Sequence, residues 1–340
     1  MFAKVFKNSQ MIDCDMQLQD DEAALLLKTR EIIGKVVKKN LAEGLLFSGG
    51  IDTSVLALEA SKHKRITAIT VAFKQGVAED LDYAKRMALF LGLKHEIYVF
   101  DVEEMFSAVN DVITILKVFD PMEVRNSVPA YIGLKTAKNM KIKGVMTGDG
   151  LDELFLGYPW LFHLPEEELK KRLGKMWEEM QFSSIPLGKA LGVDVRTPFL
   201  DAEFVEFAKK IDIKLKLNVK DGRKYGKWLI RKAYESLIPE EIIWRSKAPL
   251  EIGTGTTVLP KFFDSQIEDE YFDEKKRLYM EKDGVRLSTK EQLFYYEIFR
   301  KLHGKPSEVY GSGIGKQCPN CKAFLGRETS FCRICGAYPI

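Results

Sequence analysis

Residues 48–54 combine groups that bind phosphate: they read Ser-Gly-Gly-Ile-Asp-Thr-Ser and follow an apolar run at 45–47. Adjacent glycines let backbone N–H groups approach an anion, and a helix that begins there directs its positive end at that anion. Asp52 would repel a bare phosphate, so its presence implies a metal ion. The Gly-x-x-x-x-Gly-Lys-Ser/Thr pattern of a Walker loop is absent, which disfavours transfer of a terminal phosphate. Two glycines alone would favour a plain turn, but the complete string between strand and helix favours a phosphate site.

A second polar turn, at residues 148–153, carries three carboxylates within five residues: Asp149, Asp152 and Glu153. Carboxylates this close repel one another unless a cation or the positive end of a helix offsets them. Mg²⁺ prefers hard oxygen ligands, so an ion held between Asp52 and Asp152 would also bridge to polyphosphate oxygens. The alternative for this turn alone is a helix N-terminus with acids in its first turn.

Alternating periodicities place both turns on an α/β fold with a parallel sheet flanked by helices. Helical patterns fall at 22–39, 79–91, 102–118 and 123–140, and β-rich runs fall at 44–47, 65–73, 95–100 and 144–147. This alternation predicts right-handed βαβ units. Ligands of open α/β sheets bind at the carboxyl ends of the strands, so both turns can face one pocket. From about residue 165 to 301 helical spacing dominates, which predicts a helical second half covering the sheet.

Several strings resemble one protein family in the same order along the chain. Residues 48–54 resemble the pyrophosphate loop of the N-type ATP pyrophosphatase (PP-loop) superfamily. Residues 148–158 resemble the Gly-Glu-Gly-Ser-Asp-Glu-x-Phe-x-Gly-Tyr motif of asparagine synthetases. Further matches are Arg-Thr-Pro-Phe-Leu-Asp at 196–201, the segment 227–231, and Trp-Arg-Ser-Lys at 244–247 followed by Gly253-x-Gly255. The resemblance covers roughly residues 22–260 and implies an adenine nucleotide alpha hydrolase-like fold.

The resemblance implies an ATP-dependent amide ligase. Such an enzyme adenylates a carboxylate, aspartate or a similar acid, releases pyrophosphate, and lets ammonia attack the acyl-adenylate. The chemistry requires charge neutralisation at the α-phosphorus and at the departing pyrophosphate rather than a covalent nucleophile.

Motif positions then assign roles to individual residues. Pyrophosphate would lie against Ser48, Gly49, Gly50, Thr53 and Ser54, Mg²⁺ would be held by Asp52 and Asp152, and Lys247 would stabilise the transition state. Gly148 and Asp149 would lie near the nucleotide and the reacting acyl group. Val71 would contact adenine, or else belong to the core. Arg125 would pair bidentately with a substrate carboxylate, the alternative being an exposed helix arginine.

Three departures from the family pattern affect these expectations. Asp149 stands where the family has Glu, so an orienting or general-base role would shift by about an ångström or act through water. Leu151 replaces a serine of the motif. Glutamine-hydrolysing members begin with a catalytic cysteine, whereas this chain has Phe2 after Met1. We therefore expect no glutaminase domain, and nitrogen supplied as free ammonia or by a separate glutaminase partner.

Four of the five cysteines form two Cys-x-x-Cys knuckles near the C-terminus, Cys318 with Cys321 and Cys332 with Cys335. This spacing indicates structural Zn²⁺ in a reducing compartment rather than a disulfide framework. A domain this small lacks sufficient core without metal, so its folding should be coupled to zinc binding. We expect an N-terminal extension (1–21), a main domain (22–306), a Gly/Ser-rich linker (307–315) and a zinc ribbon (316–340).

The net charge of +3, from 52 basic and 49 acidic residues, argues against a protein that coats nucleic acid. The tail offers at most a small nucleic-acid surface, from Lys322, Arg327 and Arg333 beside Phe324 and Phe331. No signal peptide and no stretch of roughly 18 apolar residues is present, which favours a cytoplasmic protein without a membrane partner.

Two other functions compete with the ligase. One is a tRNA-modifying sulfur transferase of the same superfamily, which the lack of any cysteine in residues 15–317 disfavours. The other is a non-catalytic nucleotide-binding scaffold whose ribbon docks a partner.

Overall fold

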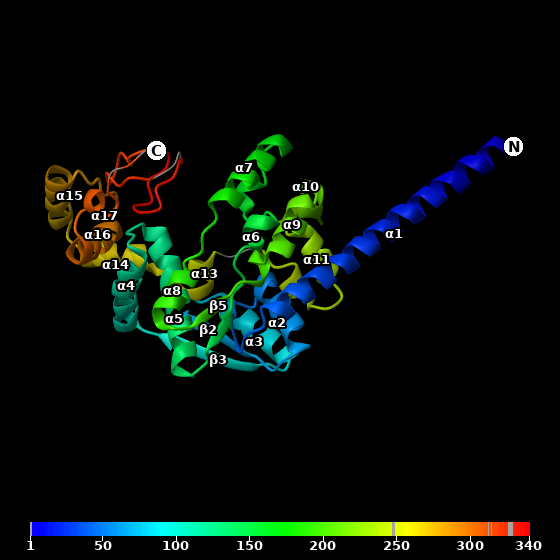
Figure 1. Cartoon of the computed structure of the whole chain (residues 1–340), viewed down its shortest axis with the longest axis horizontal. Helices are drawn as coiled ribbons and strands as arrows, with labels where there is room; N and C mark the ends of the chain where they lie inside the picture. The colour runs from blue at the N-terminus through cyan, green and yellow to red at the C-terminus, as the bar shows by residue number, and fades with distance from the viewer. Residues whose placement is uncertain (1, 247–248, 312, 314, 326–328) are drawn as a thin grey trace.

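The computed structural model of the protein is built on a five-stranded parallel sheet in the order β3-β2-β1-β4-β5 (Figure 1). It describes residues 2–246, 249–311, 313, 315–325 and 329–340, with side chains from residue 21 onward. Leu45 of β1 pairs with Ala68 of β2 on one side and with Met146 of β4 on the other. The strands of the sheet are β1 (Gly44–Leu46), β2 (Thr67–Phe73), β3 (Lys94–Phe100), β4 (Gly144–Met146) and β5 (Asp194–Arg196). Because β1 and β4 are neighbours, the turns that follow them lie side by side.

Helices cover both faces of the sheet and make up most of the second half of the chain. In the first half they are α1 (Phe2–Lys39), α2 (Ile51–Ser61), α3 (Asp80–Phe90), α4 (Val102–Leu116), α5 (Pro121–Asn139) and α6 (Leu151–Leu154). In the second half they are α7 (Glu166–Glu179), α8 (Ser184–Leu191), α9 (Ala202–Lys210), α10 (Ile213–Lys216), α11 (Trp228–Tyr234), α12 (Glu240–Ile243), α13 (Leu250–Thr254), α14 (Leu259–Gln266), α15 (Asp269–Asp283), α16 (Lys290–His303) and α17 (Pro306–Val309). Short 3₁₀ turns occupy Pro159–Leu161, Pro198–Leu200 and Thr256–Val258.

The strands divide their side chains between two hydrophobic cores, one on each face of the sheet. Leu45 and Ala68 belong to a core with α1, α2, α3, α9 and α11. Ile69 belongs to the opposite core, with α4, α5, α14 and α16, and Leu46 packs against it. Successive side chains of a strand point to opposite faces, so these apolar strands are buried on both sides. The expected α/β fold with a parallel sheet flanked by helices is confirmed.

Local sequence signals mark the N-termini of α4 and α5. Asp101 caps α4 by accepting the Glu104 N–H at 3.0 Å, and the side chain of Glu104 accepts the Asp101 N–H in return. Asp120 caps α5 by accepting the Met122 N–H at 3.1 Å, and Pro121 occupies the first helical position.

The helical second half is also confirmed, with two strand features that helical spacing did not anticipate. β5 adds a short edge strand to the sheet, and β6 (Leu217–Lys220) pairs with β7 (Arg223–Gly226) as an antiparallel hairpin. Its turn residues, Asp221 and Gly222, both have positive φ, which matches the Asp-Gly preference of tight hairpins. The helix expected at 22–39 is the C-terminal part of α1, which extends away from the body (Figure 1).

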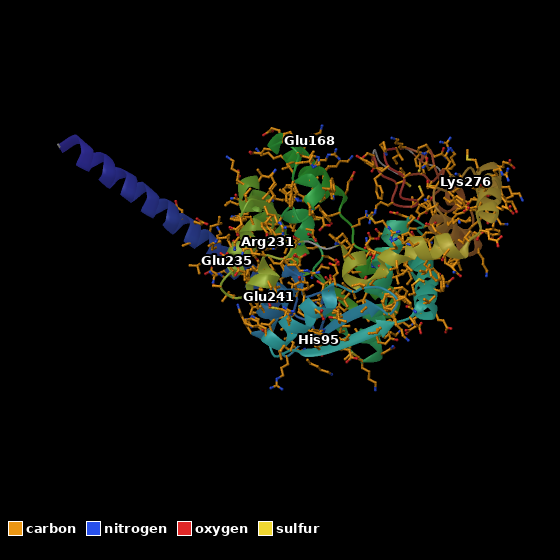
Figure 2. All side chains as sticks on the ribbon, turned by 180° about the vertical axis from the view of Figure 1, so that it is seen from behind. His95, Glu168, Arg231, Glu235, Glu241 and Lys276 are labelled. Atoms are coloured by element: carbon orange, nitrogen blue, oxygen red, sulfur yellow. The ribbon has the colours of Figure 1, made fainter. Side chains whose placement is uncertain are left out.

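The described C-terminal residues 316–325 and 329–340, called the ribbon below, pack onto the main body. Phe119 donates its N–H to Ile334 O at 2.7 Å, and Gln292 Nε2 donates to Cys335 O at the same distance. The four cysteines are buried in the core that contains α4, α5 and α16. Seen from behind, Lys276 of α15 marks the end of the molecule that carries the ribbon, and Glu168 of α7 and His95 of β3 lie on opposite edges (Figure 2).

The segment boundaries at 21/22, 306/307 and 315/316 remain predictions. The ribbon and the body share one hydrophobic core. Among the helices in the described part of the chain, we find none with the length and apolar character required to cross a bilayer.

Candidate functional site

The first polar loop, between β1 and α2, is held by its own hydroxyl groups. Ser48 Oγ accepts the Gly50 N–H at 3.2 Å and lies 3.2 Å from Thr53 Oγ1. Gly49 has a φ of +68°, and a Cβ at this position would lie 2.3 Å from the backbone nitrogen of Ala84. Only glycine fits there, and the chain therefore turns sharply from strand to helix.

The second polar turn follows β4 and packs directly against the first. A Cβ on Gly148 would lie 3.2 Å from Asp52 Cβ, so the glycine permits close approach of the two loops. Asp149 Oδ2 accepts hydrogen bonds from Thr147 Oγ1 at 2.8 Å and from Ser184 Oγ at 2.5 Å. Two hydroxyl donors from different elements thus orient the Asp149 carboxylate at the edge of the sheet.

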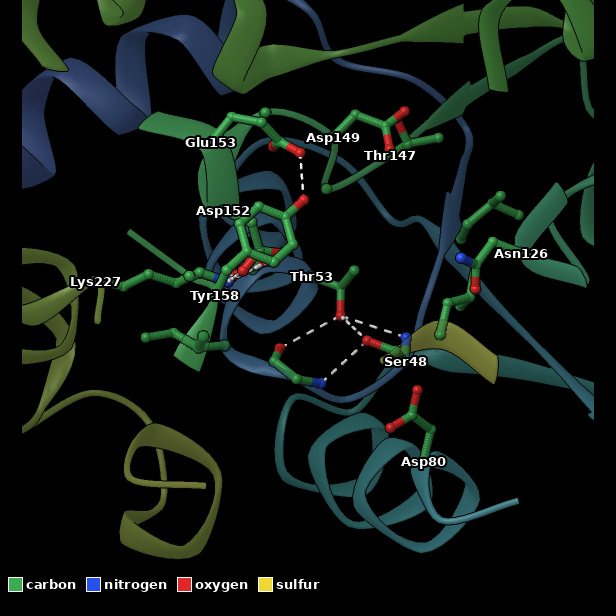
Figure 3. Close-up of a pocket in the computed structure, with 18 of the residues that line it drawn as sticks. Ser48, Thr53, Asp80, Asn126, Thr147, Asp149, Asp152, Glu153, Tyr158 and Lys227 are labelled. Carbon is green, nitrogen blue, oxygen red and sulfur yellow. Dashed lines mark hydrogen bonds and ion pairs between the residues drawn. The ribbon is translucent and has the colours of Figure 1, made fainter. Parts of the chain in front are cut away.

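A cavity of about 770 Å³, called the main cavity below, opens between the two turns (Figure 3). Its volume falls within the range of roughly 300–1,000 Å³ typical of small-molecule sites. Most of the residues that the sequence singled out lie along it: Ser48, Gly50, Asp52, Thr53, Val71, Gly148, Asp149 and Asp152. The side chain of Ser54 is fully buried in α2, and neither Ser54 nor Gly49 lines the cavity.

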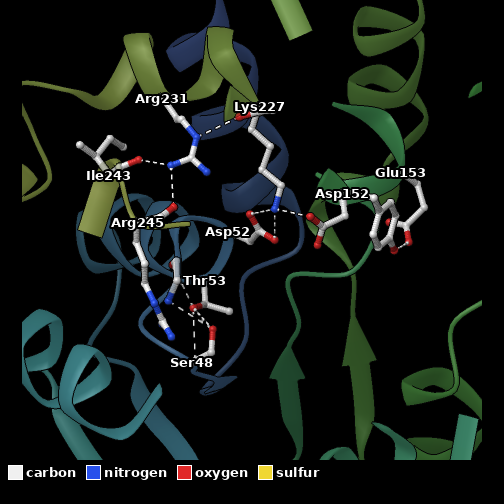
Figure 4. Close-up of polar contacts among 12 residues, drawn as sticks. Ser48, Asp52, Thr53, Asp152, Glu153, Lys227, Arg231, Ile243 and Arg245 are labelled. Carbon is white, nitrogen blue, oxygen red and sulfur yellow. Dashed lines mark hydrogen bonds and ion pairs between the residues drawn. The ribbon is translucent and has the colours of Figure 1, made fainter. Parts of the chain in front are cut away.

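Lys227 joins the two loops by an ion pair with both of the aspartates expected to hold metal (Figure 4). Its Nζ lies 2.6 Å and 2.8 Å from the two carboxylate oxygens of Asp52 and 2.6 Å from Asp152 Oδ1. The Lys227 backbone precedes α11 in the left-handed region (φ 57°) and donates its N–H to Phe155 O at 2.7 Å. The ammonium therefore supplies the positive charge that offsets the two neighbouring carboxylates.

The donor set at this position also fits a magnesium ion. Asp52 and Asp152 present hard carboxylate oxygens of opposite loops toward one point, as the Lys227 contacts show. Such oxygens, together with substrate phosphates, are the ligands that Mg²⁺ uses in phosphate-handling sites.

Two arginines, Arg231 and Arg245, also line the main cavity. Arg231 is buried and donates to the backbone oxygens of Gly226, Ile243 and Arg245, and this burial lowers its pKa to about 10. Arg245 pairs with Asp80 at 2.8 Å, and its guanidinium lies 3.9 Å from the centroid of the Tyr83 ring. These contacts tie the backbone at Ile243 and Arg245 to α11, and the Arg245 side chain to α3.

Glu153 and Tyr158 form a second polar pair on the side of the cavity where Asp152 lies (Figure 3). The Tyr158 hydroxyl donates to Glu153 Oε1 at 2.5 Å. Burial, followed by the charge of Asp152, raises the pKa of Glu153, since both effects disfavour its ionised form.

Arg125 is placed differently from either expectation. Its Nε donates to Glu251 Oε2 at 2.8 Å and its Nη1 to Glu291 Oε2 at 2.5 Å, and it does not line the main cavity. It is therefore not an exposed helix arginine, and in this structure it pairs with two carboxylates of the protein itself. Burial raises the pKa of Glu291 to about 7, an effect that the charge of Arg125 opposes.

Lys247, the residue expected to stabilise the transition state, lies outside the described residues. Several cavity-lining residues were not assigned to the site from the sequence, among them Lys227, Asp80, Asn126, Tyr158 and Arg245. Lys227 and Arg245 belong to motif strings recognised in the sequence, so a signal for them was present. Asn126 lies in the segment 119–129, which resembles the substrate-side segment of the family. Asp80 follows no local pattern, and only packing brings it to the cavity.

The four ribbon cysteines form a separate candidate metal site. All four Sγ atoms lie within 4.8 Å of one another, and the pairs Cys318–Cys335 and Cys321–Cys332 are 3.7 Å apart. A tetrahedral Zn²⁺ with Zn–S bonds of about 2.3 Å places its sulfurs about 3.8 Å apart, so the geometry fits a closed zinc site. Of the expected nucleic-acid surface, Arg327 lies outside the described residues, and Arg333 donates to Gln181 O at 3.4 Å.

Comparison with known proteins places these features in a family context. The family model described as asparagine synthase matches residues 30–188 and 186–318. The glutamine-hydrolysing asparagine synthetase of Zea mays is 29% identical over 303 residues, covering 82% of this chain and 51% of that protein. Asparagine synthetase B of Escherichia coli (strain K12), also glutamine-hydrolysing, is 28% identical over 322 residues, covering 86% and 57%. The chain thus spans about half the length of these relatives.

Solved structures resemble the chain only loosely. The NMN synthetase of Francisella tularensis aligns with 86% of this chain and 97% of its own at 15% identity, with a TM-score of 0.37.

Proposed function

This chain belongs to the asparagine synthase family, and on that premise we propose that it is an ATP-dependent amide ligase. An oxygen of the acceptor carboxylate, from aspartate or a similar acid, attacks the α-phosphorus of ATP, and pyrophosphate leaves. Ammonia then attacks the acyl carbon and loses a proton, an amide forms, and AMP leaves with the carboxylate oxygen that had attacked the phosphorus.

The observation that carries this proposal is the convergence of Asp52 and Asp152 on Lys227 between two loops at the carboxyl ends of β1 and β4. A site with cationic and anionic groups around one point can bind a polyphosphate and its metal together. Ser48, Gly50 and Thr53 line the same cavity, and their N–H and hydroxyl groups would bind pyrophosphate, with Gly49 and Ser54 acting through the loop backbone. Val71 would contact the adenine.

Asp52 and Asp152 would hold Mg²⁺, which when bound neutralises charge on the polyphosphate. Lys227, buried beside both carboxylates, adds a fixed positive charge, and Lys247 remains our candidate for stabilising the transition state. Both act where negative charge develops as pyrophosphate departs.

Asp149 would act on the acyl side. Its carboxylate is oriented by Thr147 and Ser184 at the cavity wall, so it can accept a proton from the attacking ammonia directly or through water. The nitrogen would come as free ammonia or from a separate glutaminase.

The ribbon would hold a structural Zn²⁺ through Cys318, Cys321, Cys332 and Cys335. Clustered thiols of this kind fit a reducing compartment, and we propose that the protein works in the cytoplasm.

Exchange of labelled pyrophosphate into ATP tests the proposal, because it requires only reversible adenylation. We expect exchange that depends on Mg²⁺ and on a carboxylic acid, with aspartate and larger acids compared side by side. Asp52→Asn should reduce the exchange rate at least 100-fold, whereas Asp82→Asn, an exposed carboxylate on α3, should leave it within twofold. Absence of exchange with every acid would refute the ligase assignment.

A further inference from the structure

A second cavity, of about 1190 Å³ and called the outer groove below, continues from the main cavity. The two share Glu123, Glu153, Tyr158, Gln181, Phe182 and Ser183 in their linings. The outer groove is therefore not a separate depression: a ligand that reaches past Tyr158 and Phe182 enters the site where Asp149 is held. Its volume exceeds the roughly 300–1,000 Å³ of ordinary small-ligand sites.

The ribbon forms one wall of the outer groove and α7, with the segment that follows it, forms the other. Phe324, Phe331 and Arg333 come from the ribbon, whereas Arg172 and Met176 come from α7. Without the ribbon, this side of the site would be open to solvent. The ribbon, which the sequence predicted as a structural zinc domain, thus also borders the approach to the reacting centre.

Aromatic side chains are unusually exposed along this groove. Trp160 is 57% exposed and Phe331 38% exposed, and both belong to its lining. The Trp160 ring lies 6.2 Å from that of Tyr158, so an aromatic surface runs from the groove to the rim of the main cavity. Exposed rings in a concave surface mark a place that an apolar or aromatic ligand covers.

The ribbon wall of the outer groove also carries a cation, Arg333. Arg125 is neutralised by Glu251 and Glu291. Arg333 instead lies in the groove lining, beside Gln181 at the junction of the two cavities, and its buried Nη1 has no hydrogen-bond partner among the described residues. A buried donor of this kind favours a ligand oxygen that accepts from it.

We propose that the outer groove is the acceptor channel, and that the acceptor is a carboxylic acid with an aromatic or extended apolar body, larger than free aspartate. This inference rests on the proposed ligase function. The reacting carboxylate lies near Asp149, the body of the acceptor packs along Trp160 and Phe331, and Arg333 binds an oxygen of the acceptor at the junction. The ribbon is in this view a specificity element as well as a metal site.

Pyrophosphate exchange with aspartate, succinate, 3-phenylpropanoate, indole-3-propanoate and aspartyl-phenylalanine tests the proposal. We expect at least one aryl acid to exceed aspartate tenfold or more in kcat/KM. Trp160→Ala and Phe331→Ala should each raise KM for that acid at least fivefold and change KM for ATP less than twofold. Leu302→Ala, an equally exposed apolar side chain on α16 outside the groove, should change neither constant.

The outcomes separate this inference from the ligase assignment. Exchange that is fastest with aspartate and unaffected by both aromatic variants would overturn the acceptor channel and leave the ligase standing. Aromatic variants that keep KM but no longer associate with a glutaminase subunit would also overturn it, because the groove would then dock a protein. No exchange with any acid would refute the ligase itself.

Discussion

Lys227 holds Asp52 in a buried, two-oxygen ion pair, with its Nζ 2.6 Å and 2.8 Å from the carboxylate oxygens. The same ammonium lies 2.6 Å from Asp152 Oδ1, so one cation joins the two loops of the site. Removing one partner of a buried ion pair leaves an uncompensated charge, which costs more than the pair itself contributes.

Lys227→Met should therefore lower the free energy of unfolding by roughly 3–5 kcal/mol. Mg²⁺ should restore part of this loss, because the two carboxylates then have a cation to bind. Urea unfolding with and without 10 mM MgCl₂ measures both effects, and Lys232→Met on α11, the helix that Lys227 precedes, serves as the control. A variant that is as stable as the parent chain, or that Mg²⁺ does not stabilise, would contradict the proposed overlap of ammonium and metal positions.

Arg125 should be important for stability and not for substrate binding. Arg125→Gln leaves Glu251 and Glu291 without their cation and should cost roughly 3 kcal/mol at neutral pH. KM for the acceptor should change less than twofold. A tenfold rise in KM with unchanged stability would restore the substrate-pairing role expected from the sequence.

The cost of Arg125→Gln should also depend on pH. Burial raises the pKa of Glu291 from 4.5 to about 7, so the folded protein binds this proton more tightly than the unfolded chain does. The free energy of unfolding therefore falls as pH rises from about 4.5 to 7 and the carboxyl group ionises. Without the positive charge of Arg125, the ionised form of Glu291 is less favourable in the folded protein. The loss of stability relative to the parent chain should therefore be larger at pH 8 than at pH 5.5. Denaturant unfolding at the two pH values measures the difference, and an equal loss at both would argue against Glu291 as the partner that matters.

Lys216 should make the protein more stable as pH rises above neutrality. It is buried, donates to Leu154 O at 2.9 Å and lies 4.6 Å from the centroid of the Trp177 ring, and burial lowers its pKa from 10.5 to about 8. The unfolded chain therefore binds a proton more tightly than the folded one, and the penalty of roughly 3 kcal/mol below pH 8 disappears between pH 8 and 10.5. Lys216→Met should flatten this slope in denaturant unfolding, whereas Lys214→Met, at an exposed position on α10, should preserve it.

Metal removal should destabilise the body and not the ribbon alone. The four cysteines share a hydrophobic core with α4, α5 and α16, and metal binding in such a small element is coupled to its folding. We expect one zinc per chain by elemental analysis, and a fall in the melting temperature of the main transition after chelation or in Cys318→Ser. A chelated protein whose main transition is unchanged would show that the ribbon folds and unfolds independently.

Much of the fold and part of the site could be predicted from the sequence because their signals are local. The alternation of helical and β-rich segments predicted the parallel sheet and its helices, and the Ser48–Ser54 and Gly148–Glu153 strings predicted two polar turns at one edge. The cysteine spacing predicted a cluster of four thiols. Each of these depends on neighbours a few residues apart, where backbone geometry and periodicity determine the outcome. The β5 strand and the β6–β7 hairpin escaped because these short segments contain charged residues, such as Asp194, Arg196 and Lys224, and lack the apolar run that marks β1 and β4.

Long-range packing decided the rest. Lys227 meets Asp52 across 175 residues, and Arg125 meets Glu291 across 166. Arg125 and Asn126 are adjacent on α5, yet only Asn126 lines the main cavity. Successive side chains of a helix point in different directions, and the side chain of Arg125 meets Glu251 of α13 and Glu291 of α16. The ribbon likewise forms a wall of the outer groove only because it shares a core with α4, α5 and α16. The sequence by itself determined which groups could bind phosphate and metal. Tertiary structure alone decided which charges meet, because burial brings together groups that no local pattern connects.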